Sequence, residues 1–483
     1  GVSEEDRIAL MKAAGRLARP NFKDRRKVSR KRRKVKRQKI REHDRQARNQ
    51  AQIREVRRDD VFAAPPLIAS DRKRKSIPLK APRNCYVCKT EYREVHFFYD
   101  SMCASCAELN YTKRFQTTDL NGQTALVTGG RVKIGFQTAL KLLRAGARTL
   151  VTTRFPNDAA QRFSRENDFK VWKDRLQIFG LDLRHSPSVE MFAKLLVNSE
   201  ARLDFLINNA AQTVRKPPGF YQHLMEGEAK TLEELPKELQ PLLASFDQCK
   251  KILETNLLPL EGGNLENTLL KTWPGKSPAI GIRASAKLSM IPYDFSEADQ
   301  SSLEIFPEGR LDADLQQVDL RKINSWRLEL ADVSTAEMLE VHLVNAVAPF
   351  ILAGKLKPLM LKHSTGAQHV VNASAMEGKF TRYTKTDKHP HTNMAKAALN
   401  MLTVTSSRDY IKKGIHMNAV DTGWITDEDP VHLGQAKKDM HDFEPPLDIV
   451  DGAARLLDPV FSGILTGNHV WGKFLKDYQP TDW

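Results

Sequence analysis

The hydrophobic residues of the chain are distributed most regularly in residues 119–483, which we call the body. At its start, the apolar run TALVT precedes a glycine-containing turn, an amphipathic segment and a second apolar run, TLVTT. This order predicts a strand, a turn, a helix and a second strand. Further apolar runs ending in turns alternate with helical segments, at residues 180–184, 203–212, 368–378 and 414–423. The pattern predicts an α/β fold with a doubly wound parallel sheet and helices on both faces.

The N-terminal segment has a different pattern. No proline or glycine occurs between Asn21 and Ala64, and the helix-forming residues Arg, Lys, Gln, Glu and Ala predominate. Such a stretch could form a helix of ~40 residues, about 60 Å long. Its few apolar residues make no continuous stripe, and a helix that is polar all round needs an external partner. We expect residues 1–83 to be a basic helical extension and linker, disordered alone and folded on its partner.

The charge of the chain is concentrated in that arm. The net charge is +17, and residues 1–83 contain 28 Lys and Arg against 10 Asp and Glu, so the body is close to neutral. A cationic arm on a neutral body favours a polyanion as the partner, and this density of cations suits an RNA backbone. A solvated tail and a nuclear import signal in RKRRKVKR are the alternatives. The expected RNA contacts are Arg25, Arg26, Lys27, Arg30, Lys31, Arg32, Arg33, Lys34, Lys36, Arg37, Lys39 and Arg41.

Four of the five cysteines form two C-x-x-C pairs: Cys85 and Cys88, and Cys103 and Cys106. Two such turns supply four thiolates, the ligand set of a closed, structural zinc site that has no open position for chemistry. A secreted disulfide scaffold would be shorter and would not carry a basic arm. The spacing predicts a small zinc-binding module at residues 84–118, with His96 as an alternative ligand or a packing residue. Cys249 is expected to be a buried free thiol.

Several motifs of the body resemble those of the short-chain dehydrogenase/reductase family. The segment TGGRVKIG (128–135) is similar to the family's cofactor turn, with Lys133 in place of the middle glycine, as in the pteridine-reductase-like branch. NNAA (208–211) resembles the Asn-Asn-Ala-Gly motif. The resemblance implies a Rossmann-type fold with a dinucleotide phosphate at a helix N-terminus. It implies cofactor contacts from Gly129, Arg131, Lys133, Ile134, Gly135, Arg154, Asp182, Asn209 and Lys396.

The charges near this turn indicate which dinucleotide the site would prefer. Family members that use NAD usually carry an acid after the second strand, where it binds ribose hydroxyls, but this chain has Arg154. With Arg131 and Lys133 nearby, an arginine there would meet a 2′-phosphate, so NADP(H) is the expected dinucleotide. The alternative is that these residues are surface cations on a retired site.

The residues that handle the proton in the family are missing from this chain. The family's tyrosine stands four residues before its lysine, where this chain has Thr392, and the family's serine aligns with Ala375. A phenol of pKa ~10 can be activated by a neighbouring ammonium, whereas an aliphatic hydroxyl cannot act as a general acid near pH 7. The family positions are Asn345, Ala375, Thr392 and Lys396, and the possible substitutes for the acid are His391 and Tyr383.

A long insertion separates the Asn-Asn-Ala motif from the family's helix asparagine. Ala211 and Asn345 are 134 positions apart, far more than in the family. These connections emerge at the C-terminal ends of the strands, so the insertion, at about 213–335, is expected over the substrate mouth. There it would act as a lid, a docking surface or a plug.

The preferred hypothesis is a non-catalytic member of this fold within a ribonucleoprotein. By analogy with former enzymes recruited to mitochondrial ribosomes, we expect a mitochondrial ribosome protein or assembly factor in the matrix. It would bind rRNA through residues 1–83, and ribosomal or assembly proteins through the insertion. The second hypothesis is an active NADP(H)-dependent oxidoreductase with a non-standard acid, and the third is a nuclear protein that senses the nicotinamide ratio. No apolar run approaches the ~18 residues of a membrane span, so no membrane association is expected.

Overall fold

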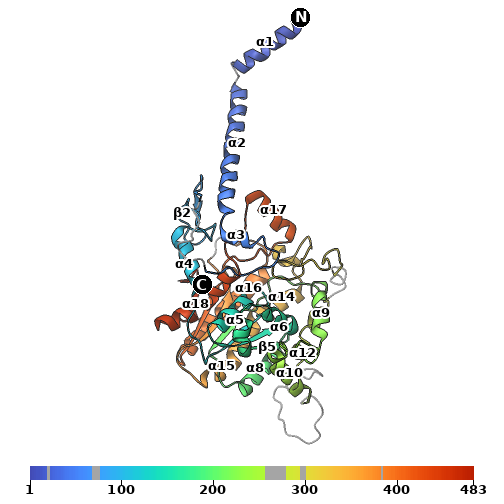
Figure 1. Cartoon of the computed structure of the whole chain (residues 1–483), viewed down its shortest axis with the longest axis vertical. Helices are drawn as coiled ribbons and strands as arrows, with labels where there is room; N and C mark the ends of the chain where they lie inside the picture. Colours follow the sequence, from blue (N-terminus) through green and yellow to red (C-terminus); the bar gives the residue numbers. More distant parts are fainter. Residues whose placement is uncertain (19–21, 68–76, 256–278, 294–300, 382–384) are drawn as a thin grey trace. The chain divides into compact units, whose positions relative to one another are not determined.

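The computed structural model describes residues 1–18, 22–67, 77–255, 279–293, 301–381 and 385–483, and Figure 1 labels their elements. The chain divides into two compact units, residues 1–58 with 68–108 and residues 59–67 with 109–483. The arm and the cysteine module, predicted as separate segments, therefore belong to one unit. The reason lies in the bonds that join the end of the arm to this module.

The described residues of the first unit form α1 Glu4–Ala18, α2 Phe22–Arg48, α3 Gln52–Val56 and a short antiparallel hairpin of β1 Arg83–Asn84 and β2 Glu91–Tyr92. Helix α4, Ala104–Phe115, begins in this unit. The arm is helical, as predicted, but α2 spans 27 residues and ends at Arg48. It ends there because Ala51 and Ile53 are buried and the Ile53 N–H donates to the carbonyl oxygen of Phe98. The buried Arg54 also forms a 2.7 Å ion pair with Asp100, which fixes the turn after α2.

The second unit is built on an eight-stranded sheet in the order β10-β9-β8-β7-β6-β3-β4-β5, in which β10 alone is antiparallel to its neighbour. The order reverses between β3 and β6, as in a doubly wound sheet, so the predicted Rossmann-type fold class is confirmed. The strands are β3 Thr124–Thr128, β4 Arg148–Thr153, β5 Leu176–Gly180, β6 Phe205–Asn208, β7 Gln368–Ser374, β8 Ile415–Asp421, β9 Phe474–Lys476 and β10 Gln479–Thr481.

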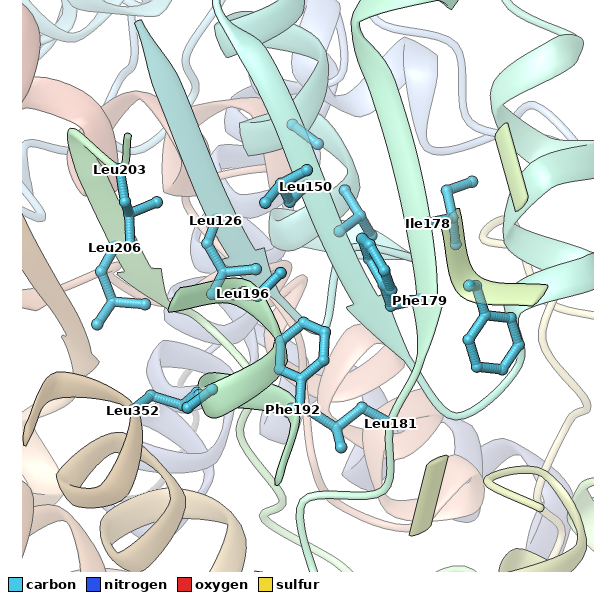
Figure 2. Packing of buried hydrophobic residues seen from close by; sticks show 14 of the residues in the cluster. Leu126, Leu150, Ile178, Phe179, Leu181, Phe192, Leu196, Leu203, Leu206 and Leu352 are labelled. Carbon is cyan, nitrogen blue, oxygen red and sulfur yellow. The ribbon is translucent and has the colours of Figure 1, made fainter. Parts of the chain in front are cut away.

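Helices cover both faces of this sheet (Figure 1). On one face α5 packs against α18, and on the other α8 packs against α15. Because side chains alternate along a strand, neighbouring residues of β3 enter different layers. Leu126 joins the cluster of Leu150, Leu206 and Leu352 seen in Figure 2, whereas Val127 packs with the residues of α18. The main helices are α5 Lys133–Arg144, α6 Pro156–Ser164, α8 Ser186–Ser199, α15 Ala348–Leu361, α16 Pro390–Ile411, α17 Val431–His441 and α18 Ile449–Thr466.

The described residues of the insertion form mostly short helices joined by irregular segments. Two of its helices, α10 and α12, pack against the edge strand β5, and α9 packs against α6. A later helix, α14, continues through a π-helical turn at Leu343–Val347 into α15. Its helices in the described residues are η3 Pro218–Phe220, α9 Gln222–Ala229, α10 Gln240–Thr255, α12 Ile280–Arg283, η4 Lys287–Met290, η5 Ser325–Arg327, η6 Leu330–Asp332 and α14 Thr335–His342.

One helical run, Thr335–Leu361, is long and apolar enough to cross a membrane. Half of its most apolar window is buried inside the body, and α15 packs against α8 and β6. Burial of this kind is typical of a core helix of the fold.

Candidate functional site

The glycine turn joins β3 to α5 with the backbone geometry that close approach to a phosphate requires. A Cβ on Gly135 would lie 2.2 Å from the carbonyl oxygen of Gly129, so a larger residue does not fit there. Gly129 has a φ of +68° and Lys133 a φ of +54°. This left-handed conformation costs a non-glycine residue roughly 1–2 kcal/mol. Position 133 thus keeps the backbone of the family's glycine while it carries a cation.

The Asn-Asn-Ala motif holds this turn in place. The Asn209 side-chain amide donates to the carbonyl oxygens of Thr128 (3.0 Å) and Gly129 (3.2 Å). The Ala210 N–H donates to the Thr128 hydroxyl at 3.0 Å. Helix α5 begins without a side-chain cap, and Ile134 in its first turn packs on the core. A rigid turn before an uncapped helix N-terminus has a geometry that suits a bound phosphate.

Arg154, the residue predicted to meet a 2′-phosphate, is bonded to the insertion. Its guanidinium donates to the Tyr221 hydroxyl (2.8 Å) and to Ser289 Oγ (3.1 Å). It also lies over the Tyr221 ring, 4.7 Å from the ring centroid. Tyr221 and Ser289 both belong to the insertion, so both terminal nitrogens of the Arg154 guanidinium are bonded to the insertion.

Arg131 and Lys133 also face acidic residues. Arg131 is buried and forms a 2.6 Å ion pair with Asp158. Burial lowers the pKa of the Arg131 guanidinium, although the charge of Asp158 opposes this shift. Lys133 acts on Glu428: burial alone would raise the pKa of that carboxyl, but Lys133 and hydrogen bonds from Thr426 and Thr213 hold it below its ordinary value. These cations therefore have carboxylate partners within the chain.

Asp182, one of the cofactor contacts that the resemblance implies, is buried and bonded within the chain. Its carboxylate accepts hydrogen bonds from the Arg184 guanidinium, the shortest at 2.6 Å, and its N–H donates to the carbonyl oxygen of Gly281 in the insertion (2.8 Å). Arg184 also pairs with Glu340 at 2.7 Å. The sequence GLDLR (180–184) places Arg184 two residues after Asp182. This spacing is the sequence signal that could have predicted an ion pair between the two.

Glu340 is the centre of a buried charge network. It accepts from Arg184, from Arg215 (2.6 Å) and from the Tyr293 hydroxyl. Burial acts to raise the pKa of Glu340, but the two guanidinium groups outweigh it and lower the value to about 2. This network ties the insertion residues Arg215 and Tyr293 to the strand end that carries Asp182.

The insertion fills the space beside these strand ends with apolar side chains. Phe155, directly after Arg154, packs in a cluster with Phe220, Tyr221 and Phe306. A Cβ on Gly180, at the end of β5, would lie 2.5 Å from the Phe246 ring and 2.8 Å from Ser285 Oγ. Arg154 and Asp182, two of the predicted cofactor contacts, thus both bond to residues of the insertion.

At the opposite end of the candidate site, the family positions lie near one another but lack an acid. Lys396 is buried and donates to the carbonyl oxygen of Ala373 (2.8 Å), and burial lowers its pKa to about 8. The Asn345 amide exchanges 2.8 Å hydrogen bonds with the backbone of Gln212. Thr392 Oγ1 donates to the Thr213 carbonyl oxygen at 3.4 Å. Ala375 offers no hydroxyl, and Ser374, one position earlier, donates to Asn400 at 2.5 Å.

The substitute acids do not supply a proton donor within the described residues. His391 is buried, and both of its ring nitrogens are without hydrogen-bond partners there. Burial, with the nearby His389 and His342, lowers the pKa of His391 to about 4, so the ring is neutral at pH 7. Tyr383 lies outside the described residues.

The four predicted cysteine ligands come together in the first unit. Their sulfurs lie within 4.8 Å of one another, and Cys88 and Cys103 are 3.7 Å apart. Four sulfurs at about 2.3 Å from one zinc ion would be about 3.8 Å apart, so the cluster has the dimensions of a metal site. Hydrogen bonds from Thr90 lower the pKa of Cys88 to about 6, which favours a thiolate. His96 instead packs against Phe97, and its Nδ1 accepts from the Phe98 N–H.

The twelve arm cations predicted to contact RNA are all exposed on α2. Within the part of the chain that the structure describes, none of them forms an ion pair with a carboxylate. The arm is anchored at its other end, where the Asp44 carboxylate accepts from the N–H groups of Lys80 (2.7 Å) and Ala81 (3.1 Å). The unit therefore presents a cationic helix on a fixed base.

Two segments of the body match profiles of known families. Residues 123–230 match the short chain dehydrogenase family, and residues 321–444 match the enoyl-(acyl carrier protein) reductase family. The segment between them, 231–320, is most of the insertion. The chain is 29% identical to an uncharacterised protein of Acanthamoeba polyphaga mimivirus over 84% of this chain and 76% of the viral protein. It is 39% identical to human dehydrogenase/reductase SDR family member 13, over 19% of this chain and 24% of that protein.

Solved structures with a similar outline include nicotinamide-bound enzymes. One is a short chain dehydrogenase from Burkholderia cenocepacia in complex with NADP (15% identity, TM-score 0.43), with 74% of this chain and 97% of that one covered. Another is an NADPH-bound carbonyl reductase from chicken fatty liver (16% identity, TM-score 0.42), with 75% of this chain and 100% of that one covered.

Proposed function

Because its body is related to the short-chain dehydrogenase/reductase family through residues 123–230 and 321–444, we propose that this protein is a non-catalytic member of that fold that binds RNA through its arm. The observation that carries the non-catalytic part is the bonding of Arg154 to Tyr221 and Ser289. A dinucleotide would have to break these bonds, and the contacts of Asp182 with Arg184 and Gly281 as well.

The chemistry of the remaining positions supports the same proposal. Hydride transfer to a carbonyl needs a group that delivers a proton to the oxygen. Thr392 has an aliphatic hydroxyl and Ala375 has none. His391 is neutral at pH 7 because its pKa is about 4, and a neutral imidazole is a very weak acid. Lys396 does not take this role in their place, since its ammonium donates to the backbone of β7.

The arm supports the RNA-binding part. Its exposed cations repel one another along α2 and lack carboxylate partners within the described residues. Phosphates would relieve this repulsion and release counterions, the main source of affinity in such complexes. The four cysteines fit a zinc ion, which would stiffen the module on which Arg54 and Asp44 fix the base of the arm.

We propose a ribonucleoprotein as the setting, with ribosomal particles as the first candidate and the insertion as a contact for neighbouring proteins. The mitochondrial matrix stays a prediction from analogy. In such particles, the charged arm would bind RNA phosphates and the folded body would contact proteins.

The test is sedimentation of the native protein in a density gradient at moderate salt. The full chain should travel with ribonucleoprotein particles and should move to the top of the gradient after ribonuclease treatment. A variant without residues 1–40 should stay at the top, because this deletion removes eleven of the twelve predicted RNA contacts and keeps Asp44 and the buried base of the arm. A full chain that stays free of particles and RNA contradicts the proposal.

A second candidate is an NADP(H)-dependent oxidoreductase, and the intact glycine turn favours it. Gly129, Gly135 and Asn209 form a turn whose geometry suits a phosphate. Lys396, the family's lysine position, bonds to Ala373 near the C-terminal end of β7. Titration of the full chain with NADPH, followed by fluorescence or calorimetry, separates the two. Saturable micromolar binding together with turnover of a carbonyl compound would favour the enzyme.

A further inference from the structure

Three histidines meet at the end of the sheet opposite the glycine turn. His369 is the second residue of β7 and His416 the second residue of β8, and the two are register partners in this parallel pair. His469 follows the C-terminal end of α18, in the loop before β9. The glycine turn lies at the C-terminal ends of the strands, so this cluster is separate from the candidate dinucleotide site.

The distances in this cluster are those of a metal site. Nε2 of His369 and Nδ1 of His469 are 2.9 Å apart, and one nitrogen from each of the three rings lies within 4.8 Å of the others. Three nitrogens at about 2.0–2.1 Å from a tetrahedral zinc ion would be about 3.3 Å apart. Small side-chain shifts are therefore enough to bring all three onto one ion.

The surroundings leave these rings in the form that binds metals. His416 Nδ1 is 3.3 Å from the carbonyl oxygen of Gln368 and donates to it, so its Nε2 keeps the lone pair. In His369, Nε2 is the ring nitrogen that faces His469, and Nδ1 is buried without a hydrogen-bond partner in the described part of the chain.

The local sequence positions His469 for this purpose. The Asn418 amide donates to the Val470 carbonyl oxygen (2.8 Å), and the Gly472 N–H donates to the Met417 carbonyl oxygen (2.8 Å), which hold the loop on β8. On the other side, a Cβ at Gly463 of α18 would lie 2.4 Å from His469 Nδ1. The absence of a side chain there makes room for the imidazole.

We propose that His369, His416 and His469 bind one divalent transition-metal ion, zinc by preference, through one nitrogen of each ring. Neutral imidazoles select zinc, copper or nickel over calcium and magnesium, which prefer oxygen ligands. His369 and His416 are buried whereas His469 is partly exposed, so water can fill the fourth position. The ion ties the loop before β9 to β7 and β8.

The test is the zinc content of the tag-free full chain after dialysis against metal-free buffer, with folding checked by circular dichroism. His469→Ala should hold one equivalent fewer than the wild type, two falling to one if the four cysteines hold the other ion. His441→Ala is the matched control, because His441 is exposed on α17, and it should keep the wild-type content. Equal zinc in the wild type and in His469→Ala overturns the proposal.

A measurement on the wild type covers the case in which His469→Ala does not fold. Zinc X-ray absorption of the full chain should show a nitrogen shell at about 2.0–2.1 Å beside the sulfur shell at about 2.3 Å expected for the cysteines. A spectrum with sulfur scattering alone overturns the three-histidine site and leaves the cysteine site standing.

Discussion

A single missing methyl group at Gly135 determines the shape of the phosphate turn. Because a Cβ there would lie 2.2 Å from the Gly129 carbonyl oxygen, Gly135→Ala should force the turn apart. We expect a loss of about 1–3 kcal/mol in the free energy of unfolding, measured by urea denaturation. Gly354→Ala is the control, since Gly354 lies in α15 with no atom within 4 Å of its would-be Cβ. It should be neutral or gain up to about 1 kcal/mol, and equal effects at both sites would contradict the argument.

Glu340 gives the body a specific acid sensitivity. Its folded-state pKa, about 2, lies below the ordinary value of 4.5. The ionised group therefore contributes stability that is fully present above about pH 4.5 and is lost as the pH falls towards 2. Glu340→Gln should be less stable than the wild type by roughly 2–3 kcal/mol at pH 7, and this difference should shrink below pH 4.5.

Urea denaturation of both proteins at several pH values measures that difference. Glu329→Gln is the matched control, because Glu329 is exposed and pairs only with Lys388 at the surface. Its effect should stay below about 1 kcal/mol. A constant gap between wild type and Glu340→Gln from pH 7 to pH 3 would contradict the proposed charge network.

At the scale of elements, α2 is anchored near its C-terminal end, where Asp44 and Ala47 are buried, and its preceding turns are exposed. Its cations are exposed, and its apolar residues Val28 and Val35 are about half exposed. The sequence allowed a longer helix, and tertiary contacts of Ala51 and Ile53 decided where it ends. The physical reason is that helix propensity continues through this stretch, whereas burial of these two side chains requires a turn.

The salt dependence of RNA binding tests α2 directly. Replacing Lys31, Arg32 and Arg33 by glutamine should weaken binding and reduce the slope of log K against log salt by about 0.7–0.9 for each phosphate that the arm no longer neutralises. The control replaces Lys170 and Lys173, exposed cations of the body, by glutamine and should leave the slope unchanged. An unchanged slope in the α2 variant would mean that another surface binds the RNA.

At the scale of the whole molecule, we expect the insertion to prevent reductase activity even when the family's catalytic tyrosine and serine are reintroduced. The double variant Thr392→Tyr with Ala375→Ser supplies the family's tyrosine and serine, yet Arg154 and Asp182 stay bonded to Tyr221, Ser289 and Gly281. We expect no oxidation of NADPH with simple carbonyl compounds in a spectrophotometric assay. Turnover by this variant would show that the insertion admits the dinucleotide, and the plug would be wrong.

The sequence by itself determined the elements whose signals are local. The alternation of apolar runs and helical segments predicted the parallel sheet. This was possible because the hydrophobic periodicity of a strand or a helix is visible in consecutive residues. The cysteine spacing predicted the cluster of four sulfurs that the structure contains. It could do so because each C-x-x-C turn places two sulfurs close together through local geometry alone. The glycine turn kept its form for the same reason, since φ and close approach are properties of the backbone there.

Only the tertiary structure decided what those elements do together. Arg154 has the residue type for a 2′-phosphate, but Tyr221 and Ser289, far along the chain, take its hydrogen bonds. His369, His416 and His469 carry no motif spacing, and the pairing of β7 with β8 and the return of the chain after α18 bring them together. Long-range partners are set by how the chain packs, and a charge or an imidazole acts according to the partner that packing gives it.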